Sequence, residues 1–174
     1  AFENTMPTPP LRLQRADIAR RIPHQGRMCL LDAVTAWDDR QIVCRTGSHR
    51  ATDNPLRAQG RLGAACGVEF AAQAMAVHGA LLAEREPDGG RAAPRAGYLA
   101  SVRSVNLQVQ RLDTIAVDLT VTAERLLGDA NHVLYHFSIE AGSQLLLEGR
   151  AAVVLDAAVL RQIANPIRVP GESL

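Results

Sequence analysis

The stretch from Leu62 to Ala83 contains very few polar side chains. Only Glu69, Gln73 and His78 interrupt a run of alanine, leucine, valine, methionine, phenylalanine, cysteine and glycine. A helix that is apolar on all sides is either enclosed by the rest of its protein or crosses a membrane. An ionisable residue in mid-span and the strand-rich sequence that follows argue against a crossing. We therefore predict a buried central helix and no membrane partner.

From Gly97 onward the apolar positions recur at every second residue, which is the period of a β-strand with one buried face. Residues 128–131 and 141–143 carry the glycine, aspartate, asparagine and serine typical of hairpin turns. The last run is apolar on both faces near its end, as in a strand covered on two sides or lying at a subunit interface. The first run changes phase near Arg103, which predicts a β-bulge. The expected strands are 99–109, 115–124, 132–139 and 145–155.

Shorter elements precede the central helix. Residues 11–22 predict a short amphipathic helix that ends before Pro23, and 28–34 with 40–46 predict a first hairpin. Two strands, one buried helix and four antiparallel strands make an α+β arrangement with the helix on one sheet face. One sheet cannot cover such a helix on every side, so we expect at least a homodimer, or a heterodimer with a related chain.

The length of 174 residues fits a single domain. Within it, 1–10 is expected to be a loose arm, 84–96 a mobile surface loop and 164–174 a tail. The 19 basic residues nearly balance 18 acidic ones and form no basic block, which argues against nucleic acid as a partner. Three widely spaced cysteines predict buried free thiols in a reducing compartment. With no export signal in residues 1–10, we expect the cytoplasm.

Glu69 is the first candidate for chemistry. Its helical neighbours are small or apolar apart from Gln73, one turn further on. An apolar setting favours the protonated form of a carboxyl group, the form that gives a proton to a leaving oxygen. The alternative is a structural contact in which Gln73 is the partner of Glu69. His24 lies in a loop before the first hairpin, where a histidine most often braces a turn.

Four segments of the chain resemble a known family: IPHQGRMCLLDAV, GVEFAAQAMAVHG, GYLASVRSV and LLLEGRAAVVL. They are similar to the hot-dog-fold 3-hydroxyacyl-ACP dehydratases, and especially to the divergent branch associated with aryl-polyene-type gene clusters. The resemblance covers 22–155, and its most specific parts are Glu69-x-x-x-Gln73 and Pro23-His24. It implies an antiparallel sheet wrapped around one long helix. It also implies that Glu69 is the acid assisting departure of the 3-hydroxyl group.

One expected feature of that family is missing. Ordinary members carry a Gly-His-Phe-Pro-Gly loop before the helix, whose histidine removes the α-proton, whereas 54–61 here contains no histidine. In the family, the two catalytic residues come from opposite subunits. Either His24 or His49 supplies the base, or a partner subunit does. Other hypotheses are a hot-dog thioesterase in which Glu69 is base or nucleophile, and a non-catalytic partner of another dehydratase.

The resemblance also implies the substrate and its contacts. The acyl chain would be carried as a thioester on the phosphopantetheine of acyl carrier protein or on CoA, with no other cofactor and no metal. Its carbonyl would lie at the helix start near Gly63 and Gly67, where backbone N–H groups can stabilise negative charge. Gln73 and Arg61 are the other predicted substrate-binding residues. For docking of an acidic carrier protein, the candidates are Arg57, Arg61, Arg91 and Arg95.

Overall fold

The computed structural model describes residues 12–86, 97–129 and 132–154. The predicted arm at 1–10, the tail at 164–174 and residues 87–96 of the predicted loop at 84–96 lie outside the described residues, and so do Arg91 and Arg95. Glu84 and Arg85, predicted to begin that loop, belong to the long helix. What the structure describes is one long helix against one antiparallel sheet, as the sequence pattern predicts.

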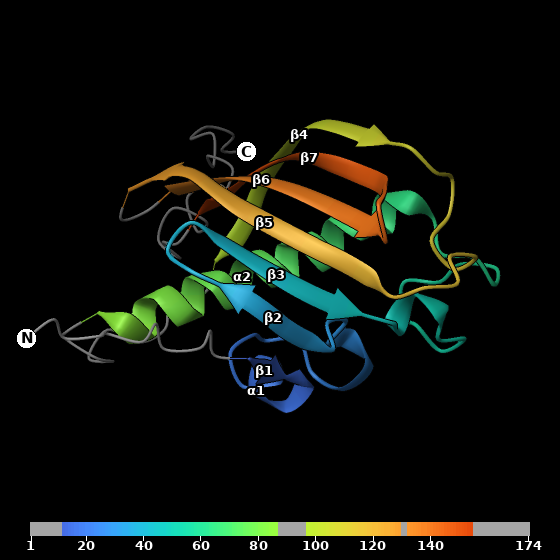
Figure 1. Ribbon diagram of the computed structural model, residues 1–174, viewed down its shortest axis with the longest axis horizontal. Coiled ribbons are helices and arrows are strands. Elements are labelled where there is room, and N and C mark those ends of the chain that lie inside the picture. The colour runs from blue at the N-terminus through green and yellow to red at the C-terminus, as the bar shows by residue number, and fades with distance from the viewer. Residues whose placement is uncertain (1–11, 87–96, 130–131, 155–174) are drawn as a thin grey trace, which may run out of the picture.

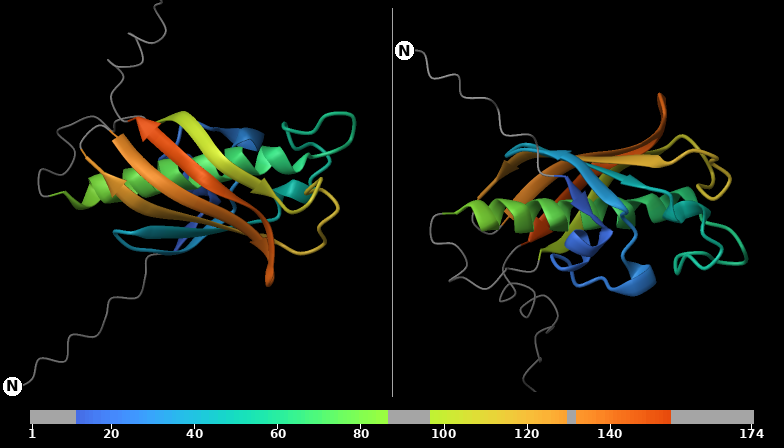
Figure 2. Two further views of the ribbon diagram at one scale, coloured as in Figure 1. Left: turned by 90° about the horizontal axis from the view of Figure 1, so that it is seen from above. Right: turned by 60° about the horizontal axis from the view of Figure 1, so that its bottom comes forward.

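The central helix is α2, Gly67–Arg85, and a 3-10 turn at Ala64–Cys66 leads into it. Leu62 and Gly63, predicted to be helical, instead pair with a later segment: Leu112 N donates to Leu62 O at 2.8 Å. The stretch Ala64–Arg85 is long and apolar enough to span a membrane. It lies along one face of the sheet, however, with half of its most apolar window buried, so it is the core helix (Figure 2).

The sheet has seven strands in the order β1-β2-β3-β5-β6-β7-β4, and all described pairings are antiparallel (Figure 1). The four later strands and the first hairpin are present, although the first arm of that hairpin is 33–37 and not the predicted 28–34, and a two-residue strand is added at one edge. The bounds are β1 Leu13–Gln14, β2 Ala33–Trp37, β3 Gln41–Thr46, β4 Tyr98–Leu107, β5 Leu119–Gly128, β6 His132–Ala141 and β7 Gln144–Val154.

The registers confirm one expected irregularity and correct one strand. The β4–β7 pairing shifts between Arg103 and Asn106, where Ser104 has a φ of 53°, so the predicted bulge is present. The alternation expected from residue 115 begins only at Leu119, because Ile115 and Val117 precede the strand. Val117 is accordingly 53% exposed.

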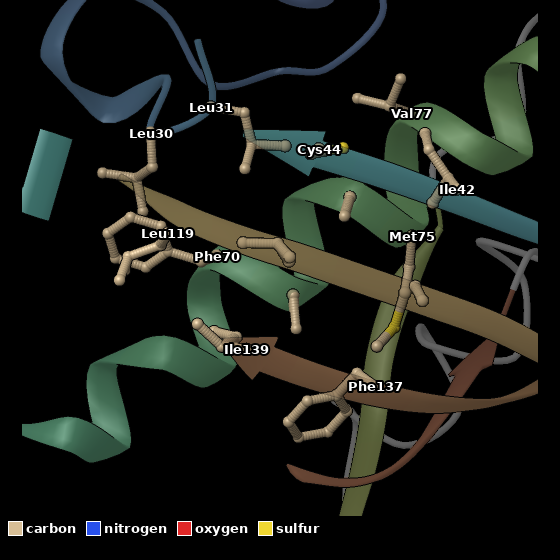
Figure 3. Packing of buried hydrophobic residues seen from close by; sticks show 14 of the residues in the cluster. Leu30, Leu31, Ile42, Cys44, Phe70, Met75, Val77, Leu119, Phe137 and Ile139 are labelled. Carbon is tan, nitrogen blue, oxygen red and sulfur yellow. The ribbon is translucent and has the colours of Figure 1, made fainter. Parts of the chain in front are cut away.

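Side chains from the inner sheet face and from α2 interlock to form the core. Figure 3 shows Phe70 and Met75 of α2 among residues of β5 and β6, including Leu119, Phe137 and Ile139, and all five are buried. Within the described residues α2 packs against β3, β5 and β6.

The first helix is shorter than its pattern suggests. Helix α1 covers Arg15–Ala19, and its start is fixed by Asp17, whose carboxylate accepts the backbone N–H of Gln14 at 3.0 Å. Only Ile18 is buried in this helix. A loop containing Pro23 and His24 then leads to a 3-10 turn, Gly26–Met28, and on to β2. This path carries His24 across to the beginning of α2.

Candidate active site

Glu69 lies in the first turn of α2, where the helix dipole favours a negative charge. Its side chain is 35% exposed. The carboxylate is therefore half-buried, and not enclosed as its apolar neighbours in the sequence suggest. The reason is geometric: one face of α2 packs on the sheet, and Glu69 lies at the margin of the covered face. Its carboxylate remains accessible from the side that the sheet leaves open.

The side chain that meets Glu69 is His24. Its Nε2 lies 3.1 Å from Oε1 of Glu69, and the imidazole is 28% exposed. Forty-five positions separate the two residues in the chain, so their spacing gave no reason to pair them. Within the described part of the protein, Nδ1 of His24 is buried and has no hydrogen-bond partner. Of the histidines considered as a base, His24 is the one that the fold brings to Glu69.

The loop that carries His24 is held in place from two directions. Gln25 donates from Nε2 to the carbonyl oxygens of Ala19 at 2.7 Å and Ile22 at 3.2 Å. Arg15 donates to Gly26 O at 3.1 Å and also pairs with Asp32 at 3.0 Å. Side chains that satisfy buried or part-buried backbone carbonyls fix an irregular segment in one conformation. His24 thus sits on an anchored loop.

Gln73 joins this loop to the helix. Its Oε1 accepts the N–H of Leu30 at 2.9 Å, and its Nε2 donates to Met28 O at 2.7 Å and to Oε1 of Glu69 at 3.4 Å. The side chain is fully buried. Both amide hydrogens and one oxygen lone pair are therefore in use within the protein. Gln73 therefore lies in the structure as a positioning residue next to Glu69, whereas the sequence analysis predicted that Gln73 binds the substrate.

The residues predicted to bind substrate at the helix start lie in different environments. A Cβ at Gly67 would lie 2.8 Å from both terminal carbons of Leu147, so this glycine is needed for packing against the sheet, and its N–H bonds to Ala64 O and Ala65 O. Gly63 has open space around it. Of the N–H groups expected to be free, that of Ala64 donates to Gln110 O and that of Cys66 to Gly63 O. Arg61 is exposed.

The loop that lacks the family's histidine is occupied by a structural network. Asp113, whose side chain is 6% exposed, accepts the Leu62 N–H at 2.9 Å and bonds with Arg111. The hydrogen bonds from Arg111 hold the pKa of the Asp113 carboxyl well below its usual range. Arg57 donates to Gly60 O and Arg50 O, and its side chain is only 14% exposed. Arg57 is thus an internal brace, which contradicts its prediction as a docking residue.

The other histidines have partners away from Glu69. His49 is buried with Nε2 3.0 Å from Ile115 O, which gives no support to its prediction as the base. His78 is buried between Tyr135 Oη at 2.9 Å and Asp38 O at 2.7 Å. Burial lowers the pKa of both rings below the ordinary value and raises the pKa of Tyr135 to about 12. These groups belong to the folded framework.

Comparison with known proteins places this geometry in a family. The family model described as ApeP-like, ApeP dehydratase, matches residues 16–163. The chain belongs to the ApeP-like dehydratase family. Its predicted resemblance to hot-dog dehydratases is thereby confirmed, and so is its prediction as a dehydratase or dehydratase subunit. A search of curated proteins gave no match.

Solved structures agree with the family assignment of this ApeP-like chain. A chain of the dehydratase heterocomplex ApeI:P from Xenorhabdus doucetiae is 25% identical, with a TM-score of 0.72 over 86% of this chain and 97% of that one. A hypothetical thioesterase with coenzyme A from Streptococcus pneumoniae TIGR4 is 13% identical, with a TM-score of 0.51 over 71% of this chain and 84% of that one. The second likeness shows the hot-dog fold alone.

Proposed function

We propose that this ApeP-like chain is a subunit of a 3-hydroxyacyl thioester dehydratase in which Glu69 and His24 form the acid–base pair. The observation that carries the proposal is the 3.1 Å contact between His24 Nε2 and Glu69 Oε1. A general acid and a general base must both reach the substrate, and this contact places the two candidate groups side by side. Membership of a dehydratase family supports the reaction class.

The reaction needs one base and one acid. His24 takes the proton from C2 of the 3-hydroxyacyl thioester, and the electron pair of that C–H bond forms the C2–C3 double bond. The C3–O bond breaks, and the oxygen leaves as water with a proton from Glu69. The two side chains then exchange a proton across their direct contact, so that the imidazole and the carboxyl group return to their starting forms. Gln73 donates to Glu69 and to Met28 O, and so fastens the loop that carries His24 to the helix that carries Glu69.

The second subunit in this proposal is a related hot-dog chain. The similar ApeI:P structure is a heterocomplex, which supports a heterodimer over a homodimer. The substrate is carried on acyl carrier protein or CoA, in a pathway of the aryl-polyene type, with no cofactor beyond the phosphopantetheine arm of the substrate. The three free cysteines, two of them buried, fit a reducing cytoplasm.

The test is turnover of a 3-hydroxyacyl thioester on acyl carrier protein by the chain alone and together with a hot-dog subunit encoded beside it. Glu69→Gln and His24→Gln should each lower the rate of the complete assembly by roughly 100-fold or more. Glu84→Gln is the matched control, because Glu84 lies on the same helix but pairs with Arg21 at 2.8 Å on the surface. Its rate should equal that of the wild type.

Two results would overturn the proposal. One is full activity of the complete assembly with Glu69→Gln, which would make this chain a non-catalytic partner. The other is release of free thiol from the acyl thioester, lost in the same variant, with no enoyl product. That outcome would make it a thioesterase.

A further inference from the structure

Met28 stands apart from the other exposed apolar side chains of the protein. Eight large apolar residues are exposed within 12–86, 97–129 and 132–154, and seven of them lie on β4, on β5 or just before β5. Met28 is the eighth, at 40% exposed, and it follows His24 on the loop that leads to β2. A single exposed apolar residue is ordinary by itself, so its surroundings decide what it does.

The main chain of Met28 is fixed beside Glu69. Its N–H donates to Gln25 O at 3.1 Å, and its carbonyl oxygen accepts from Gln73 Nε2 at 2.7 Å. The same Nε2 donates to Oε1 of Glu69 at 3.4 Å, so one nitrogen joins the carboxylate to the main chain of Met28. Both polar groups of this backbone unit are therefore bonded, and the exposed side chain starts from a fixed point close to the acid–base pair.

The helix face beside Met28 is apolar beyond Gln73. Residues 69, 72, 73 and 76 share one face of α2, because residues three or four apart are neighbours on a helix. Ala72 and Ala76 are half-buried, and the amide of Gln73 is used by the main chain of Met28 and Leu30. From Glu69 toward the end of α2, this face therefore offers methyl groups and the methionine, with no free polar group.

The two sides of the acid–base pair thus differ in polarity. Toward the helix start lie the polar loop 54–61 and Gly63, which is exposed with open space around it. Toward the helix end lies the apolar face with Met28. A 3-hydroxyacyl thioester has the same asymmetry, since its thioester and pantetheine amides are on one side of C3 and its hydrocarbon tail is on the other. With C2 and C3 at the acid–base pair, the tail fits the Met28 side.

We infer that the Met28 side chain binds the hydrocarbon tail of the substrate and sets a preference for longer acyl chains. The inference rests on the proposed function and adds a residue that contacts the part of the substrate beyond C3. A four-carbon 3-hydroxyacyl group ends just beyond C3 and gains little from Met28, whereas a ten-carbon group extends along it. The unbranched thioether side chain of methionine adapts its shape to such a flexible tail.

The test compares two chain lengths on the complete assembly with the neighbouring hot-dog subunit. Met28→Ala should lower kcat/KM for a 3-hydroxydecanoyl thioester on acyl carrier protein roughly tenfold and leave that for the 3-hydroxybutyryl thioester unchanged. Met28→Leu should keep the wild-type ratio and Met28→Gln should lose it, although both keep the backbone bond to Gln73. Leu127→Ala is the matched control, because Leu127 is 67% exposed near the end of β5, and it should change neither value.

Binding separates this inference from the proposed chemistry. The probes are two pantetheine thioethers with a ten-carbon or a four-carbon 3-hydroxyalkyl chain, which lack the carbonyl group and cannot be dehydrated. Calorimetry should show that Met28→Ala lowers the affinity of the assembly for the longer probe roughly tenfold relative to the shorter one. Equal losses for both probes, or none, would show that the inference is wrong even if the assembly is active. A selective loss in an assembly without turnover would support the tail site and overturn only the proposed reaction.

Discussion

Replacing Gln73 by methionine tests whether its amide holds the site together. Methionine keeps the length of the side chain and removes all three of its hydrogen bonds. The fully buried Leu30 would keep an N–H without an acceptor, which costs about 1–3 kcal/mol. Met28 is 40% exposed, so water can replace the bond to its carbonyl. We expect the free energy of unfolding to fall by about 1–3 kcal/mol.

The same substitution should lower activity more than binding. Met28 and Leu30 follow His24 closely along the loop, so losing the clamp frees both His24 and Glu69 from one side. A misplacement of about 1 Å can cost roughly 100-fold in rate. We expect kcat to fall by about that factor while KM changes little, since the amide of Gln73 is already used within the protein.

Urea unfolding followed by circular dichroism measures the stability, and the slope against urea should be unchanged. Gln144→Met is the control, because Gln144 is exposed at the start of β7. The reasoning is refuted if the Gln73 variant loses less than about 0.5 kcal/mol, the range of ordinary surface substitutions. It is also refuted if KM rises while kcat stays constant, which would restore the predicted substrate contact.

Two further predictions concern the framework around the site. Burial lowers the pKa of His49 and His78 below 6.5, so the unfolded chain binds more protons than the folded one below that pH. The free energy of unfolding should therefore fall as the pH drops below 6.5, by up to about 1.4 kcal/mol per pH unit for each histidine. Urea titrations at several pH values measure this, and a free energy that does not change with pH would contradict it. Gly149→Ala should destabilise the protein by about 1–3 kcal/mol, because its Cβ would lie 2.8 Å from the buried ring of Phe137. Gly79→Ala, whose Cβ would have no atom within 4 Å, should stabilise the helix by about 0.5–1 kcal/mol. Thermal unfolding of the two variants measures both effects. Equal melting temperatures for these two variants would show that the packing argument is wrong.

Periodicity predicted most of the fold because the elements bury a whole face. The run from Leu119 to Ala123 alternates, and so does that from Val133 to Ile139, and both strands are present with those faces buried. The ends of the helices and strands were predicted less well. Residues 115–117 continue the alternation but precede the strand, and Leu62 pairs with Leu112 in place of starting the helix. Leu62 contacts Leu112, and residues 115–116 accept bonds from His49 and Arg50; no local pattern contains such distant contacts.

The site was predictable residue by residue but not as an arrangement. Glu69 stands out because a carboxylate in an apolar helix is rare, and His24 because Pro23-His24 matches the family. That these two meet depends on the loop after α1, whose path is set by Gln25 and Gln73. Gln25 does not differ in the sequence from an ordinary surface residue, and nothing in the sequence shows that Gln73 bonds to Met28 and Leu30. The close packing of Gly67 on Leu147 and the ion pair of Arg57 with Asp113 were not predicted for the same reason, since these partners are distant in the chain.

Residues 54–61, which contain no histidine, form a loop that is fixed by its own contacts. In this chain the loop is tied down by Arg57 and by Asp113, which also holds the start of the helical region through the Leu62 N–H. A segment fixed in this way cannot swing a new side chain towards Glu69. His24 reaches the carboxylate from the other side, on a loop that Gln73 fastens to the same helix. The Glu69 side chain is 35% exposed, so its carboxylate can be reached from outside this chain. The proposed function thus assigns both the acid and the base to this chain, and it assigns to the partner the enclosure of the substrate.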